Sequence, residues 1–305
     1  MTQQKWYTML GKKLLNLARI IRIALASFHQ EGGVRGAAGM AYYTLFSFFP
    51  LLIVLVTIGT FFLDGSETTN KVAQLVVSVF PVSQNLVQVN LSRILVVRNS
   101  IGILGLVLLL WSGSNAFSMM VHNITSAWPK SEQRSFFEKR LFGLAMVIVI
   151  LLVLFLLMVS STLLNVLVKY SDTIPGLDEL YNSWLWNFGA KVSYWAVPFI
   201  FFYSLYRIIP MGRVPIRAAG FSALGITIAW RFASNIFQWY LGSGFARYEV
   251  IFGSLSAIVV LLLWIYISSL ILFFGAHLCA AAAGKVELDF PGGINALSIN
   301  NKSQN

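Results

Sequence analysis

The sequence has one cysteine, Cys279, and only three histidines, His29, His122 and His277. A single cysteine excludes an internal disulfide and any metal centre held by several cysteines. The histidines lie far apart, and the sequence contains neither an HExxH string nor a Gly-x-x-x-x-Gly-Lys-Ser/Thr phosphate loop. We therefore predict no catalytic residues, no metal site and no cofactor, and we do not expect an enzyme.

Charged residues are also scarce. They make up 11% of the chain, against about 25% in soluble domains, whereas hydrophobic residues make up 57%. Together with a mean hydropathy of +0.75, this composition excludes an ordinary soluble protein. It predicts an all-α, polytopic membrane protein. The net charge of +11 is then explained by anionic membrane lipids and by topology, not by nucleic acid.

Six stretches are apolar enough to cross a hydrocarbon core, which takes about 20 residues. The longest contains no Asp, Glu, Lys or Arg, and its small and polar residues predict a helix packed centrally in a bundle. A helix that lines a substrate path is the alternative. We predict transmembrane helices over residues 37–63, 101–119, 141–168, 188–209, 218–241 and 255–283.

The rest of the chain divides into three parts. Residues 1–35 are basic and amphipathic, and we expect them to lie in the membrane interface or, equally, against the bundle's own surface. Residues 64–100 are too polar to span, and they predict two short helices on the outer surface. Residues 36–283 would form the six-span bundle, followed by a polar tail, 284–305, that we expect to be disordered.

Basic residues orient these spans. Fifteen of the 22 Lys and Arg fall on the side that carries both termini, six fall on the other side, and Arg231 lies within a span. Because basic residues concentrate in cytoplasmic segments, both termini are predicted to be cytoplasmic. The expected partners are membrane lipids, mainly anionic ones, and not nucleic acid. Protein partners and homo-oligomerisation are left open by the sequence.

Four stretches carry a family resemblance: AAGMAYYTLFSFFPLL, WSGSNAFSMMVHNITSAW, LYRIIPMGRVP and IVVLLLWIYISSLILFFGAHL, in that order. Together they resemble the YihY / virulence factor BrkB family of bacterial inner-membrane proteins. The resemblance implies a multi-pass protein of the inner (cytoplasmic) membrane with a poorly defined activity. Members were once labelled ribonucleases, and some are linked to export of lipid-type envelope components. The family usually reads Gly-Ala-Glu-Leu-Asn where this chain has Gly275-Ala276-His277-Leu278-Cys279, so any role of that glutamate would be altered here.

Arg231 is the candidate site residue with the clearest physical argument. An arginine deep in a span costs about 2.5–3.5 kcal/mol and usually faces the bundle or a wet cavity. Its guanidinium suits phosphate or carboxylate. The structural alternatives are snorkelling to the outer head groups and pairing with Glu249. Polar clusters in other spans would line a groove that reaches Arg231, or else they would only join helices. The predicted substrate-binding residues are Arg231, Asn235, Ser112, Asn115, Tyr43 and Ser47.

Basic residues near the predicted cytoplasmic face form a second set of candidates. The predicted lipid-headgroup contacts are Lys12, Lys13, Arg19, Arg22, Arg207, Arg213 and Arg217. The sequence thus favours a protein that moves, or provides a path for, an anionic amphiphile or envelope lipid. The alternative is a non-catalytic membrane scaffold for envelope-assembly partners. A ribonuclease is disfavoured, because the chain has no clustered metal ligands.

Overall fold

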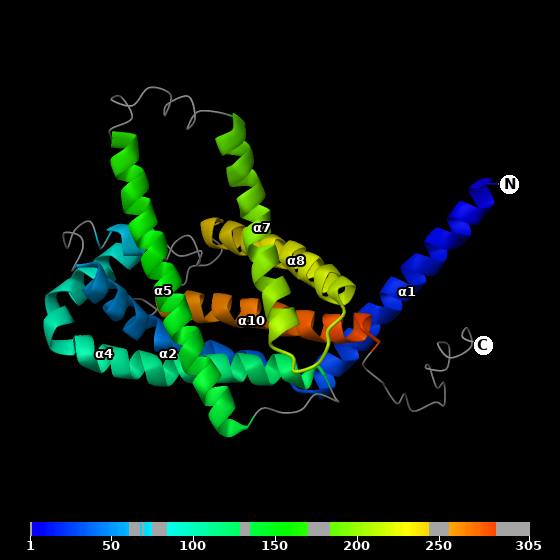
Figure 1. Cartoon of the computed structure of the whole chain (residues 1–305), viewed down its shortest axis with the longest axis horizontal. Coiled ribbons are helices and arrows are strands. Elements are labelled where there is room, and N and C mark those ends of the chain that lie inside the picture. Colours follow the sequence, from blue (N-terminus) through cyan, green and yellow to red (C-terminus); the bar gives the residue numbers. More distant parts are fainter. Residues whose placement is uncertain are drawn as a thin grey trace.

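The computed structural model describes residues 2–60, 68, 70–74, 84–128, 135–169, 184–243 and 256–284. Within these ranges all regular secondary structure is helical, which confirms the predicted all-α class (Figure 1). The helices are α1 (Thr2–Gln30), α2 (Gly33–Gly59), α4 (Gln84–Ser126), α5 (Phe136–Lys169), α7 (Trp184–Ile208), α8 (Ile216–Gly242) and α10 (Ser256–Ala282).

α10 is the central helix of the fold. It packs against α1, α2, α4, α7 and α8, and Figure 1 shows it crossing the middle of the molecule. A helix that is apolar on all sides needs covering on all sides, by protein or by lipid. The 27 residues of α10 contain no Asp, Glu, Lys or Arg, and neighbouring helices cover much of that surface. The prediction of a centrally packed helix is confirmed.

α2, α4 and α5 form one side of the bundle. α2 continues as a helix through Pro50 and lies antiparallel to α4, because Gly36 approaches Asn123 while Ile53 approaches Gly105. α5 packs on α4 where Gly143 lies against the backbone carbonyl of Ser114. These glycines allow the helix backbones to come close together, as small residues do in membrane bundles.

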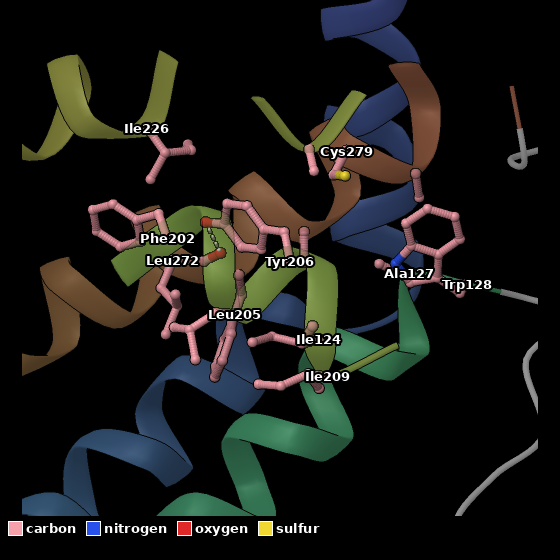
Figure 2. Close-up of a cluster of buried hydrophobic side chains, with 14 of the residues drawn as sticks. Ile124, Ala127, Trp128, Phe202, Leu205, Tyr206, Ile209, Ile226, Leu272 and Cys279 are labelled. Atoms are coloured by element: carbon pink, nitrogen blue, oxygen red, sulfur yellow. Dashed lines mark hydrogen bonds between the residues drawn. The ribbon is translucent and has the colours of Figure 1, made fainter. Parts of the chain in front are cut away.

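α7 and α8 form the other side and meet α10 in a buried cluster. Figure 2 shows Tyr206 of α7 reaching α10, where its hydroxyl donates a hydrogen bond to the carbonyl of Leu272 at 2.9 Å. Gly275 lies on the same face of α10. A methyl group at this position would overlap Tyr206 and Ile226, so the close approach of α7 and α8 to α10 requires glycine there.

α1 is held against α10 only by its C-terminal part. Ala24 and Phe28 are buried, and Ala24 packs with Leu278 and Ala281 of α10. The opposite end of α1 stands away from the bundle in Figure 1. Both expectations for this segment therefore have a physical basis. One end of α1 docks on the bundle, while the other remains available to a membrane surface.

The region between the first two spans differs from its prediction. Residues 84–100, expected to be a separate surface helix, are instead the first part of α4, which is 43 residues long. Neither proline nor glycine occurs between residues 85 and 101, and extending an existing helix costs less than starting a new one.

Part of the other expected surface helix is buried. Lys71 is 7% exposed, and Val72 and Ala73 are fully buried in a cluster with Val56 of α2 and Leu261 of α10. The described residues 70–74 are therefore packed into the bundle and do not lie on its outer surface. The remaining residues of this predicted helix, including Val76 and Val79, lie outside the described ranges.

Three described helices are long and apolar enough to cross a membrane. They are Gly33–Gly59, Ile103–Ser126 and Ile258–Ala282, with mean hydropathies of 2.0, 1.6 and 2.6. They match the first, second and sixth predicted spans. α5, α7 and α8 cover the other three predicted spans without reaching the same criterion over their described residues, and six crossings remain a prediction.

Candidate functional site

The packing of α8 on α10 gives the depth of Arg231. Ile226 lies against Gly275, the indole nitrogen of Trp230 is 3.4 Å from the hydroxyl of Ser268, and Phe237 contacts the ring of Trp264. The two helices therefore run antiparallel over residues 226–237 of α8 and 264–275 of α10. This register places Arg231 beside the middle of Ile258–Ala282, the most apolar of the three candidate spans.

Arg231 is held by Tyr194 of α7. Its guanidinium carbon lies 3.4 Å from the centroid of the Tyr194 ring, and one of its terminal nitrogens donates a hydrogen bond to the Tyr194 carbonyl. The ring of Trp230 is 5.3 Å away. Within the described part of the chain, the buried Nε atom of Arg231 has no hydrogen-bond partner. Aromatic faces and carbonyls attract the cation but carry no negative charge of their own.

The helices around Arg231 contain no acidic residue. Neither α7, α8 nor α10 has an Asp or Glu anywhere along its length. Glu249, the predicted protein partner, lies outside the described residues. Among the described residues the guanidinium charge is therefore stabilised by Tyr194 and Trp230 and is not neutralised.

The surroundings of Tyr194 are open. Residues 191–195 of α7 are all exposed, and five successive residues of an α-helix cover every direction around its axis. This part of α7 is thus only partly covered by protein, although Tyr194 contacts Arg231 of α8. In a bilayer, lipid would reach the Tyr194–Arg231 contact from the exposed sides.

Asn235 lies one turn after Arg231 on α8. Its side chain is exposed, and it forms no hydrogen bond with any other described residue. Ser234, between these two positions, is buried, and its hydroxyl donates to the carbonyl of Trp230 at 2.8 Å. Of the two substrate contacts predicted on α8, Arg231 is therefore engaged with the protein, whereas Asn235 has no hydrogen-bond partner among the described residues.

The other four predicted substrate residues gather on α2 and α4. The antiparallel register of these helices places Tyr43 and Ser47 at the same level as Asn115 and Ser112. Ser47 donates to the carbonyl of Thr44 at 2.9 Å, and Ser112 donates to that of Leu108 at 2.6 Å. These hydroxyls thus bond within their own helices, an arrangement that satisfies a polar group without requiring a substrate.

Asn115 and Tyr43 have side-chain neighbours. The Asn115 oxygen accepts a hydrogen bond from Arg140 of α5 at 3.0 Å, which joins α4 to α5. The ring of Tyr43 packs edge to face with that of Tyr42, with 5.3 Å between their centroids. The α2–α4 group lies across α10 from Arg231, because α8 packs on α7 and α10 whereas α2 packs on α4 and α10 (Figure 1). A path joining both groups would have to pass around α10.

The basic candidates lie along α1 and around the turn between α7 and α8. Arg207, in the last turn of α7, donates to the carbonyl of Val214 at 2.6 Å and so closes the turn between α7 and α8. The side chains of the remaining described members are exposed, as expected for head-group contacts: Arg19, Arg22, Arg213 and Arg217. The side chains of Lys12 and Lys13 lie outside the described part.

His277 has a role that the sequence analysis did not find. It is 1% exposed, its Nδ1 lies 2.9 Å from the hydroxyl of Ser27, and its ring packs edge to face on Phe28. This residue therefore links α10 to α1. The only sequence signal was the position itself, where the resemblance implied a glutamate. Within the described ranges, no three His, Cys, Asp or Glu side chains gather as a metal site would require.

Fold and site together define a helical, polytopic membrane protein with an arginine at mid-depth. The chain belongs to the family described as Virulence factor BrkB, which matches residues 24–293. This finding confirms the resemblance noted in the sequence. No solved structure matches the chain.

Three curated relatives differ in how much of their own length this chain covers. A Bacillus subtilis protein named putative ribonuclease-like protein YfkH is 29% identical over 254 residues, which cover 81% of this chain and 89% of that protein. A UPF0761 membrane protein of Xanthomonas campestris is 27% identical over 81% of this chain, and one of Xanthomonas oryzae is 28% identical over 82%. The chain spans only 56% and 57% of these two Xanthomonas proteins.

Proposed function

We propose that this membrane protein moves, or provides a path for, an amphiphile with an anionic head group, and that Arg231 contacts the head group. One observation carries the proposal: a guanidinium lies at the middle depth of the bundle, and the helices around it contain no acidic residue. A charge at this depth is costly, and polar residues inside membranes are usually functional.

The chemistry of Arg231 suits such a ligand. Guanidinium presents several donors in a planar fork that matches phosphate and carboxylate oxygens. Tyr194 already occupies one face of the group and one terminal nitrogen, which fixes the orientation of the side chain. An anionic head group would supply the missing negative charge and further acceptors.

The exposed part of α7 provides the approach. Residues 191–195 are all exposed, so an acyl chain can remain in the bilayer while its head group reaches Arg231. The sequence contains no nucleotide-binding phosphate loop. We therefore infer that movement is passive, driven by a gradient, or energised by another protein.

Lipid translocation in liposomes tests the proposal. Full-length protein is reconstituted with acyl-labelled phosphatidylglycerol or, for comparison, acyl-labelled phosphatidylcholine, and the rate of transfer between leaflets is measured. We expect faster transfer of the anionic lipid, a roughly tenfold loss in Arg231→Gln, which corresponds to about 1.4 kcal/mol, and partial activity in Arg231→Lys. Arg35→Gln, which removes an exposed charge near the start of α2, is the matched control.

Two results would contradict the proposal. The first is an inserted and stable Arg231→Gln protein that transfers lipid as fast as the wild type, which would make Arg231 structural. The second is wild-type protein that transfers neither lipid faster than empty liposomes, which would favour the scaffold function.

α1 offers a membrane contact that would serve either function. It exposes Leu15, Ile21 and Leu25, alongside Arg19 and Arg22. A helix with exposed apolar and basic residues suits an anionic membrane surface. A peptide of residues 1–30 should become helical on anionic vesicles and dissociate as salt rises. Equal binding to neutral vesicles would show that the basic residues are irrelevant.

We do not propose ribonuclease activity. The name of the Bacillus relative describes that protein, and a metal-dependent nuclease needs clustered acidic and histidine ligands. In the part of the chain that the structure describes, His122 is exposed on α4, whereas His277 is buried between α10 and α1.

A further inference from the structure

One face of α8 is exposed along the length of the helix and repeats with a heptad pattern. Its positions follow one another at alternating intervals of four and three residues, the spacing of a helix–helix seam. All six are exposed: Phe221, Gly225, Ile228, Phe232, Asn235 and Trp239. We call these six residues the α8 seam.

Asn235 makes this face unlike an ordinary lipid-facing surface. It lies at the depth of the apolar span of α10, its neighbours along the seam are apolar, and it has no hydrogen bond to other described residues. A carboxamide that faces hydrocarbon has no water to bond, so a polar partner stabilises it. Asparagine in spans commonly hydrogen-bonds across helices.

Gly225 independently indicates that another helix packs on this face of α8. A methyl group added at Gly225 would meet only Leu278, at an ordinary contact distance of 3.9 Å, so the fold of this chain does not need glycine there. Gly275 is the contrast, because a methyl group there would overlap Tyr206 and Ile226. Glycine inside a helix costs about 0.5–1 kcal/mol relative to alanine. Gly225 and Ala229, both exposed, form a small-xxx-small pair that permits close approach of another helix.

We propose that the α8 seam binds the α8 seam of a second copy of this chain. Two copies inserted in one membrane share the same orientation, so a two-fold axis along the membrane normal relates them. Their α8 helices then run parallel, and each seam residue meets its own equivalent at equal depth. Asn235 therefore faces Asn235 of the second copy, and because a carboxamide both donates and accepts, the pair is self-complementary.

The size of the face is sufficient for such a pair. Phe221, Phe232 and Trp239 are 44%, 66% and 66% exposed. With side chains of about 150–250 Å² each, these three offer on the order of 400 Å² per copy. Ile228 and Gly225 add to this area, and two copies together approach the ~1,000 Å² expected of a specific interface.

This inference does not rest on the proposed function. Arg231 is directed toward Tyr194 of α7 and is not a seam residue. The proposed dimer does give Asn235 a role in contact between two copies, which differs from the predicted substrate contact. The two roles are separable, because Asn235→Leu should change the oligomeric state whereas Arg231→Gln should not.

Cross-linking in native membranes tests the contact directly. Phe232→Cys should form a dimer with a short bismaleimide or under mild oxidation. The matched control is Val197→Cys on α7, an exposed position (63%) at similar depth. The native Cys279 is buried, so the unaltered protein provides the background. A Phe232→Cys dimer yield no higher than that of Val197→Cys would contradict the proposal.

The mass of the full-length protein in lipid nanodiscs or dilute vesicles supplies the second measurement. We expect dimers in the wild type and in Asn235→Gln, and a dissociation constant about 5- to 30-fold higher in Asn235→Leu, the effect of losing one or two interhelical hydrogen bonds. Gly225→Leu should weaken the dimer further by holding the backbones apart. Single copies of the wild type at every dilution, or equal dimerisation of Asn235→Leu, would overturn the proposal. Because the wild-type measurement needs no substitution, it tests the proposal even if a variant fails to fold.

Discussion

The guanidinium carbon of Arg231 lies 3.4 Å from the centre of the Tyr194 ring, and the same side chain bonds the Tyr194 carbonyl. One residue of α7 thus provides both interactions that hold the arginine of α8. The contact fixes where the charge lies without neutralising it. A structural tie between two helices and a site for an anion are therefore compatible functions of the same side chain.

The Tyr194 ring should contribute to stability through Arg231. Tyr194→Leu removes a cation–π contact worth about 0.5–2 kcal/mol, whereas Tyr194→Phe keeps the ring and should be nearly neutral. The free energy of unfolding in detergent measures both changes. In an Arg231→Gln background the effect of Tyr194→Leu should largely disappear. An unchanged effect would mean that the ring acts through other neighbours.

Gly275 should not tolerate even one added methyl group. Gly275→Ala would press on Tyr206 and Ile226, and overpacking of this kind costs about 1–3 kcal/mol. The matched control is Gly220→Ala on α8, where no atom lies within 4 Å of the added methyl. Thermal unfolding of purified protein should show a midpoint below that of the wild type for Gly275→Ala but not for Gly220→Ala. Equal midpoints for the two variants would refute the packing described for α10.

The link between Ser27 and His277 should hold α1 on the bundle. Ser27→Ala leaves the buried His277 nitrogen without its partner, at a cost of about 1–3 kcal/mol. Limited proteolysis should therefore cut α1 faster in Ser27→Ala than in the wild type. His29→Ala, which changes an exposed side chain in the same turn, should have no effect. If both variants are cut at the wild-type rate, the hydrogen bond does not hold α1.

Both termini should lie on the cytoplasmic side. Reporter fusions at the termini and near residues 130 and 213 should report the cytoplasm, and fusions near 68, 175 and 246 should report the opposite side. The reason is the unequal distribution of Lys and Arg. A terminus on the opposite side, or an odd number of crossings, would refute the charge argument.

Sequence patterns predicted much of the fold. Composition and the lengths of apolar stretches predicted an all-α bundle, and α10 was identified as central because small and polar residues interrupt its uncharged apolar sequence. The break predicted before Ile101 was wrong, because polarity was taken as the end of a helix although no residue there interrupts one. The burial of Val72 and Ala73 was missed because an amphipathic segment between two spans was predicted to lie on the outer surface, and its pattern does not show what its apolar face packs against.

The candidate site was less accessible to sequence reasoning. Arg231 was identified because a single charge inside an apolar stretch can be recognised from the sequence alone. Its partner Tyr194 was not identified, because a backbone carbonyl and an aromatic ring 37 positions away leave no pattern in the sequence. The pairing of Ser27 with His277 is hidden for the same reason. The exposure of Asn235 depends on which face of α8 the neighbouring helices cover, and only the packing reveals it.

The hydrogen bond between α1 and α10 also constrains how the chain is made. Ser27 and His277 are 250 residues apart, and a ribosome adding 5–20 residues each second needs about 12 to 50 s to cover that distance. During that interval the docking face of α1 has no α10 to bind. The bilayer surface is the nearest environment that can cover its apolar side chains, so α1 should rest on the membrane first and join the bundle last.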